Sequence, residues 1–155
     1  MIQSGLNIGS GIETHSRLWS VNPMLSYTKH PHKTISIGSG FEQFEGFYVP
    51  LFLDFRADFL KKDVTPFFYM KTGILFPLSG DEDYWNYSRN VRNGWIFGSG
   101  LGFSWPMSRI ESFVRIGYRY AHTSIITKDY YVTPNTVEKE IDNYNRIELT
   151  WGFTF

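Results

Sequence analysis

Apolar and polar side chains alternate strictly along residues 47–59, FYVPLFLDFRADF. The odd positions are all apolar, whereas the even positions Asp54, Arg56 and Asp58 are charged. A period of two predicts a β-strand with one apolar face and one polar face. The segment is about twice the usual strand length of roughly 5–6 residues, and a membrane-spanning barrel needs about 9–11 residues per strand. The pattern therefore predicts a transmembrane β-strand.

Similar alternation recurs along the rest of the chain, whereas apolar residues at helical spacing do not appear. Phe, Tyr, Ile, Val and Thr are frequent in the alternating segments, as expected for strands. We expect one domain, 1–155, that forms an eight-stranded antiparallel up-and-down transmembrane β-barrel. Its predicted strands cover 2–13, 17–28, 34–44, 47–60, 64–78, 94–106, 110–125 and 143–155.

The connections between these strands differ in length. Segments 29–33, 61–63 and 107–109 are short and polar, whereas 79–93 and 126–142 are predicted as long loops. For 126–142 the alternative is an exposed hairpin that extends the strands beyond the membrane. Short turns at one end and longer loops at the other are typical of outer-membrane barrels. This pattern predicts that both termini lie on the periplasmic side.

The positions of glycine indicate which face points inward. Most of the 14 glycines fall in the predicted strands, at positions with the parity of the charged face. The interior of a narrow barrel has little room, so small residues must alternate there with long ones. We therefore expect the charged face to line the lumen and the apolar face to contact lipid. A soluble two-sheet sandwich, which would bury the apolar face, is the alternative fold.

The predicted lumen contains equal numbers of acidic and basic residues. Because buried charges persist only when they are paired and hydrogen-bonded, we expect a salt-bridge network that plugs the barrel. An ion or proton path through the same residues is the alternative. The expected members are Glu13, Glu42, Asp54, Asp58 and Glu148 with Arg56, Lys71, Arg115, Arg119 and Arg146.

Outward-facing aromatic residues are expected near both ends of the strands, where a bilayer favours aromatic girdles. Trp19, Phe47 and Trp95 would lie at the external interface, and the periplasmic set would be Tyr27, Phe59 and Trp105.

Composition excludes several other classes of protein. The chain has 155 residues, 15 basic and 15 acidic, so no net charge steers it toward nucleic acid. It has no cysteine, which excludes disulfides and thiolate metal sites. No secretory signal peptide is present, and we therefore interpret the chain as a mature sequence. We expect no cofactor.

The last strand, RIELTWGFTF, ends on Phe155 and resembles the C-terminal signal of bacterial outer-membrane proteins. The whole chain resembles the small eight-stranded outer-membrane barrel superfamily, which includes OmpX and the OmpA transmembrane domain. Residues 48–73, YVPLFLDFRADFLKKDVTPFFYMKTG, are also similar to the outer-membrane β-barrel domain family. The resemblance implies a bacterial outer-membrane location, contact with lipid or lipopolysaccharide, and recognition of the C-terminal strand by the barrel-assembly machinery. A larger outer-membrane protein complex is a further expected partner.

His122 and Ser124 are the candidate catalytic pair. They resemble the His-x-Ser arrangement of the PagL lipid A deacylases, which are also eight-stranded barrels. The resemblance implies that His122 is the general base for a Ser124 nucleophile. A carboxylate to orient the ring is not evident, because Glu148 has inward parity and Glu138 and Glu140 lie in a predicted loop. Ile125 replaces the Asn that follows Ser in that family.

The two long loops carry the candidate binding residues. Acidic residues at 81–83 raise the possibility of a divalent cation, although their spacing is not that of an EF-hand and we expect no metal site. Exposed aromatic residues on a rigid scaffold favour recognition of a surface, sugar or protein. Those in the loops are Tyr84, Trp85, Tyr87, Tyr130 and Tyr131.

Taken together, the sequence predicts a structural or accessory outer-membrane barrel that is not an enzyme. It would contact a partner through its external loops or its lipid-facing wall. A PagL-like lipid A deacylase and a narrow pore are the alternatives.

Overall fold

The computed structural model describes residues 2–12, 17–30, 32–43, 47–60, 63–78, 81–83, 87–108, 110–129 and 136–155. These residues form ten β-strands: β1 (Ile2–Ile12), β2 (Arg17–His30), β3 (Lys33–Ser39), β4 (Phe41–Gln43), β5 (Phe47–Asp58), β6 (Thr65–Pro77), β7 (Asp81–Asp83), β8 (Tyr87–Met107), β9 (Ile110–Asp129) and β10 (Thr136–Thr154). The described segments contain no helix long and apolar enough to cross a membrane.

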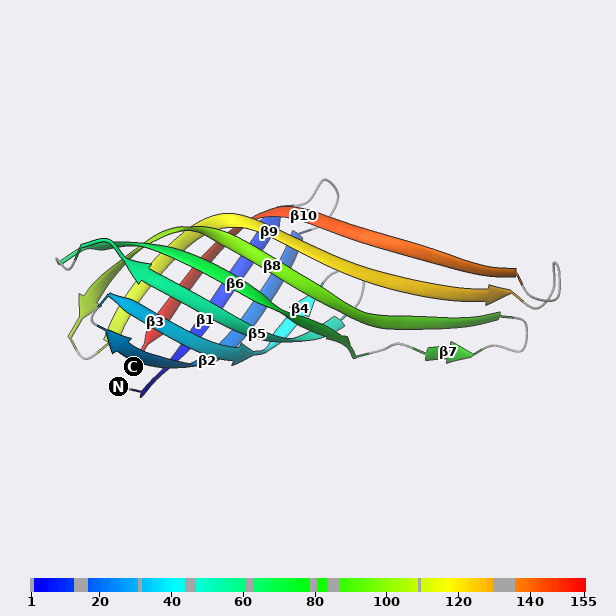
Figure 1. Ribbon diagram of the computed structural model, residues 1–155, viewed down its shortest axis with the longest axis horizontal. Helices are drawn as coiled ribbons and strands as arrows, with labels where there is room; N and C mark the ends of the chain where they lie inside the picture. Colours follow the sequence, from blue (N-terminus) through cyan, green and yellow to red (C-terminus); the bar gives the residue numbers. More distant parts are fainter. Residues whose placement is uncertain are drawn as a thin grey trace.

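The strands close into an antiparallel barrel (Figure 1). Each long strand pairs with its neighbours along the chain, and β1 pairs with both β2 and β10 to close the sheet. Strands β3 and β4 share one position between β2 and β5, and β7 pairs only with β8. The barrel wall therefore has eight strands. The predicted fold class is confirmed, and the sandwich alternative is wrong because one continuous sheet closes on itself.

The predicted strand at 34–44 is divided at Gly40 into β3 and β4. A Cβ atom at Gly40 would lie 2.0 Å from the carbonyl oxygen of Val21 on β2. Only glycine allows the two strands to approach so closely, and the regular ladder is interrupted there.

The two ends of the barrel differ (Figure 1). Both termini lie at the end that carries the short connections β2–β3, β5–β6 and β8–β9, which we call the turn end. At the opposite end β8, β9 and β10 continue past the other strands as a sheet, with β7 beside β8; we call this sheet the extension. In the register Asp129 of β9 pairs with both Tyr87 and Thr136. The prediction of a long loop at 79–93 was therefore wrong over most of that segment, because 81–83 and 87–93 are strand. At 126–142 the described residues continue β9 and β10, as expected for strands that extend beyond the membrane.

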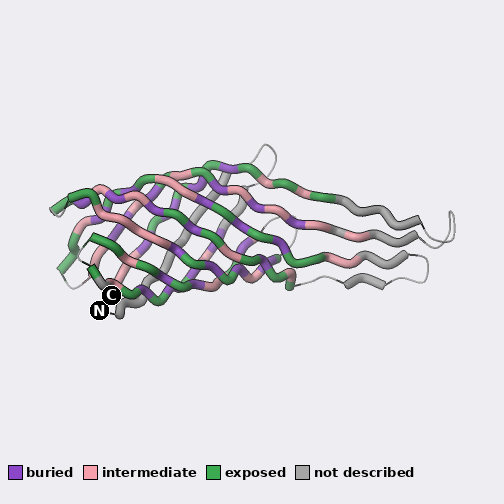
Figure 2. Tube along the Cα trace, viewed as in Figure 1, coloured by how far each residue is buried: buried purple, intermediate pink, exposed green. Residues whose placement is uncertain are grey.

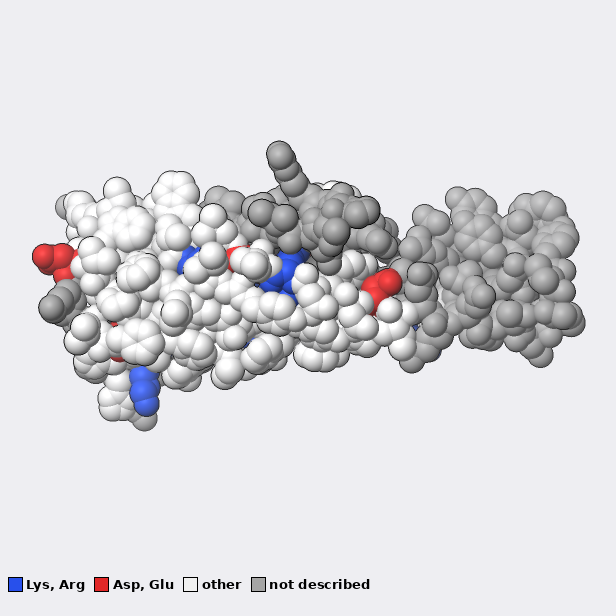
Figure 3. Space-filling view, turned by 90° about the horizontal axis from the view of Figure 1, so that it is seen from above, with Lys and Arg blue, Asp and Glu red and all other residues white. Residues whose placement is uncertain are grey.

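Burial alternates along the strands (Figure 2). On β5, Phe52 and Asp54 are buried whereas Leu51 and Leu53 are exposed. The apolar side chains thus lie on the outer wall, as the glycine pattern predicted. Figure 3 shows charged side chains at only a few places on the barrel surface that it presents.

Large and small residues alternate inside the barrel. A Cβ atom at Gly38 would lie 2.4 Å from the Phe52 ring, and one at Gly102 would lie 2.4 Å from the Phe67 ring. These glycines leave the space that the inward aromatic rings occupy, which is the physical reason for glycine on the charged face.

Candidate functional site: the charged lumen and the outer wall

Arg119 of β9 lies at the centre of the lumen. Its Nη1 donates to the Glu148 carboxylate on β10 at 2.8 Å, and its Nη2 donates to Glu42 on β4. Lys71 of β6 lies 3.7 Å from Glu42, and Arg146 lies 3.9 Å from Glu148. All five side chains are at most 5% exposed. The cluster therefore connects strands on different sides of the barrel.

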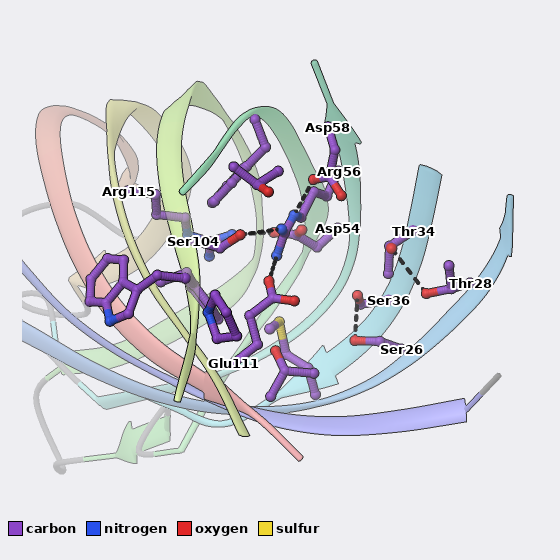
Figure 4. Close-up of a pocket in the computed structure, with 17 residues that line it drawn as sticks. Ser26, Thr28, Thr34, Ser36, Asp54, Arg56, Asp58, Ser104, Glu111 and Arg115 are labelled. Atoms are coloured by element: carbon purple, nitrogen blue, oxygen red, sulfur yellow. Dashed lines mark hydrogen bonds and ion pairs between the residues drawn. The ribbon is translucent and has the colours of Figure 1, made fainter. Parts of the chain in front are cut away.

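A second group of charges lies toward the turn end (Figure 4). The guanidinium of Arg56 donates at 2.7 Å to each of three groups, on Asp58, Glu111 and Ser104. Arg115 donates to the Asp54 carboxylate at 2.7 Å. Arg56 thus holds together β5, β8 and β9, three of the strands that form this end of the lumen.

Three of the basic groups also lie over aromatic rings. Arg56 is 4.1 Å from the centre of the Phe67 ring, Lys71 is 4.0 Å from that of Phe52, and Arg115 is 4.3 Å from that of Tyr69. Rings and carboxylates therefore replace water around these cations, which lowers the cost of burying them.

A cavity of about 350 Å³ opens within the turn-end half of the lumen (Figure 4). Besides Arg56, Arg115 and their partners, it is lined by hydroxyl groups that pair across β2 and β3. Ser26 and Ser36 lie 2.8 Å apart, and Thr28 and Thr34 lie 3.0 Å apart. Toward the extension, apolar side chains are buried inside the barrel, among them Leu75, which is fully buried. The described side chains thus leave open space in the turn-end half of the lumen.

The structure places the described members of the predicted lumen set inside the barrel, and Glu13 lies outside the described residues. Pairing follows no simple sequence rule: Arg119 binds two acids, whereas Arg115 binds one. Glu111 was missed by sequence reasoning, although it has the same parity as Arg115 on β9. That shared parity was the signal that could have identified it.

His122 and Ser124 lie on the outer wall of β9, and both are partly buried. The ring Nδ1 of His122 lies 2.8 Å from Oδ1 of Asn143 on β10. The described part of the chain therefore gives this histidine an amide partner rather than a carboxylate. Glu140 pairs with Ile125 in the backbone register and Glu138 pairs with Thr127, so both belong to strand β10 rather than to a loop.

The predicted binding aromatics and the acidic segment lie in or near the extension. Tyr84, Trp85, Tyr130 and Tyr131 fall outside the described residues, and Tyr87 is the first residue of β8. Asp81–Asp83 is a strand rather than a loop, paired with residues 88–90. Among the described residues no group of His, Asp and Glu is arranged to hold a metal ion.

Comparison with solved structures identifies the fold. AlkL, an outer-membrane protein studied in lipid bilayers, matches with a TM-score of 0.61 at 10% identity, over 99% of this chain and 89% of AlkL. Neisserial surface protein A matches with a TM-score of 0.58 at 14% identity, over 99% of this chain and 94% of that one. The outer-membrane enzyme PagL matches with a TM-score of 0.53 at 13% identity, over 96% of this chain and 97% of PagL.

No protein-family model and no curated protein sequence matches the chain. The likeness at such low identity concerns the backbone architecture, and it agrees with the closed eight-stranded wall, the apolar exterior and the charged interior described above. The chain has the fold of the small eight-stranded outer-membrane β-barrels.

Proposed function

We propose that this protein is an integral outer-membrane barrel with a closed lumen, which serves as a rigid base for the extension. The extension projects outside the cell and binds a partner there. The observation that carries the proposal is the pairing of β8, β9 and β10 beyond the rest of the barrel, which continues past a register shift between Arg92 and Trp95 of β8.

The outer wall supports placement in a membrane. Leu101, Ile116 and Leu149 lie side by side in the register of β8, β9 and β10, and each is more than half exposed. In water so much contiguous apolar surface would be unfavourable, whereas lipid tails solvate it. From Ser112 to His122 the strand β9 has the length of about 9–11 tilted residues that crosses a bilayer.

The lumen supports a closed barrel rather than a pore. The cluster around Arg119 places paired charges across the lumen. Moving Arg119 aside would leave both Glu42 and Glu148 buried without their main partner. Such an unpaired charge costs about 3–5 kcal/mol. An ion would have to meet that cost at each crossing.

The extension supports a binding role. Beyond His122, β9 continues to Asp129 at about 3.3 Å per residue, which adds about 23 Å of strand past the membrane. A hydrogen-bonded sheet is stiffer than a loop, so it can hold side chains in a fixed arrangement for recognition.

A lipid A deacylase is the competing proposal, because His122 and Ser124 lie on the outer wall as they would in such an enzyme. An amide partner cannot stabilise a protonated imidazole as a carboxylate does. The geometry at Asn143 therefore supports a protein without this activity.

Two measurements test the proposal. Protein inserted in planar bilayers is expected to show no steady conductance, and open steps in the wild type would contradict the closed lumen. In the second, residues 126–139 are replaced by a two-residue Asn-Gly turn, which keeps Ile125 paired with Glu140. This variant should still fold, shown by a boiling-dependent shift in gel mobility, but should lose the cross-linked partner that the wild type captures on intact cells. Equal capture by both would contradict a binding role for the extension.

A further inference from the structure

The outer wall of β8, β9 and β10 changes from apolar to polar along its length. Near the middle of the wall the three strands contribute Leu101, Ile116 and Leu149. Two rows of side chains further toward the extension, the corresponding residues are Phe97, Tyr120 and Asn145. The row after that contains Trp95, His122 and Asn143. The last row contains Arg92, Ser124 and Ile141.

The polar side chains of this region hold one another in place. Asn143 Oδ1 accepts a hydrogen bond from Tyr120 Oη at 2.6 Å and also lies 2.8 Å from His122 Nδ1. Tyr118 donates from its hydroxyl to Asn145 Oδ1. The Trp95 ring packs against those of Tyr120 and His122, with centres 5.0 and 6.1 Å apart. Such a network orders the surface before any ligand binds.

The network leaves a defined set of groups for a ligand. Because an amide oxygen can only accept, Nδ1 of His122 carries the proton, and Nε2 of the neutral ring is an acceptor. The amide nitrogens of Asn143 and Asn145, both exposed, are donors. Arg92 is also exposed, and it takes part in none of the salt bridges between described side chains.

We propose that this surface, formed by Arg92, Trp95, Tyr120, His122, Asn143 and Asn145, is a binding site for the headgroup of a phosphorylated glycolipid of the outer leaflet. The inference rests on the membrane placement proposed above. Sugar hydroxyl groups both donate and accept, so they match amide donors beside an imidazole acceptor. The guanidinium of Arg92 matches a phosphate, to which arginine binds with two parallel hydrogen bonds.

The apolar part of the same wall accommodates the acyl chains. Below the headgroup site lie Ile147 and Leu149 of β10, which are 63% and 55% exposed, and Ile116 of β9, which is 56% exposed. A single amphiphile aligned with the strands would therefore contact polar groups with its head and aliphatic groups with its tails. The order of polar and apolar rows gives the orientation of the lipid.

Native mass spectrometry of the detergent-folded protein tests the site. The probes are bisphosphorylated lipid A, its dephosphorylated form and phosphatidylglycerol. One molecule of bisphosphorylated lipid A is expected to remain bound. Binding should be about tenfold weaker for Arg92→Gln or Asn143→Leu, which is the scale of one lost hydrogen bond. Thr72→Val, a matched polar-to-apolar change on the outer face of β6, should bind as the wild type does.

Equal retention of lipid A and phosphatidylglycerol, or unchanged binding by both variants, would overturn the site. Equal retention of phosphorylated and dephosphorylated lipid A would overturn the role of Arg92. Each protein is first checked for a boiling-dependent gel shift and for insertion into liposomes. Failure of the wild type in those checks would instead contradict the membrane placement itself.

Discussion

Arg115 of β9 donates a 2.7 Å hydrogen bond to the carboxylate of Asp54 on β5, a residue 61 positions away in the chain. Both side chains are at most 5% exposed. The pair spans strands that are not neighbours in the sheet, since β6 and β8 lie between them. It therefore fixes the cross-section of the barrel as well as balancing two buried charges.

Replacing Asp54 with Asn should strongly destabilise the barrel. The charge of Arg115 would remain buried without its partner, so the free energy of unfolding should fall by about 3–5 kcal/mol. Urea unfolding in lipid vesicles, followed by tryptophan fluorescence, measures this change. Asp63→Asn removes an exposed carboxylate in a turn and should change stability by less than about 0.5 kcal/mol. Equal stability of the two variants would contradict the structural role of the pair.

Gly100→Ala should destabilise the barrel more than Gly98→Ala, two positions away on the same face of β8. A Cβ atom at Gly100 would lie 2.2 Å from the carbonyl oxygen of Ile116 and 2.5 Å from the Cα atom of Gly117, whereas at Gly98 the nearest atom is 3.3 Å away. Overpacking costs about 1–3 kcal/mol. The same unfolding measurement compares the two variants, and a larger loss for Gly98→Ala would be inconsistent with this packing.

The loss of stability caused by a charge on the outer wall should depend on how deep the substituted position lies in the membrane. Leu101→Arg is expected to lower the free energy of unfolding by about 2–4 kcal/mol, because the residue would lie near the bilayer midplane. Ile141→Arg should cost only about 0–1 kcal/mol, since this exposed residue lies at the external interface. Unfolding from lipid vesicles measures both. Similar costs at the two positions would argue against the proposed depth of the wall.

Ser124→Ala should leave lipid A unchanged. The His122 ring is bonded to the Asn143 amide, so the arrangement lacks the charge partner that a Ser–His pair uses. Mass spectra of lipid A from cells that produce wild type, Ser124→Ala or no protein are expected to be identical. Loss of an acyl chain only with the wild type would instead establish the deacylase.

The alternation of residues 47–59 was enough to predict which of its side chains face inward, because successive side chains of a strand point to opposite sides. The glycines on the charged face predicted that this face is the interior, since only a narrow lumen needs small residues among long ones. The number of alternating segments predicted an eight-stranded wall, and the lengths of the connections between them predicted that both termini share one end. All of these are local properties of the sequence.

The partners within the barrel were decided by tertiary structure. The pairing of Arg119 with Glu42 and Glu148 depends on strand register and on the closure of β1 against β10, which bring distant residues to one level of the lumen. The same holds for Asn143, whose place beside His122 follows from the β9–β10 register. A loop was predicted at 79–93, and at 126–142 a loop or an exposed hairpin, since neither segment shows the alternation of the membrane strands. Beyond the membrane both faces of a sheet contact water, so the apolar alternation that marks a strand is lost while the backbone pairing continues.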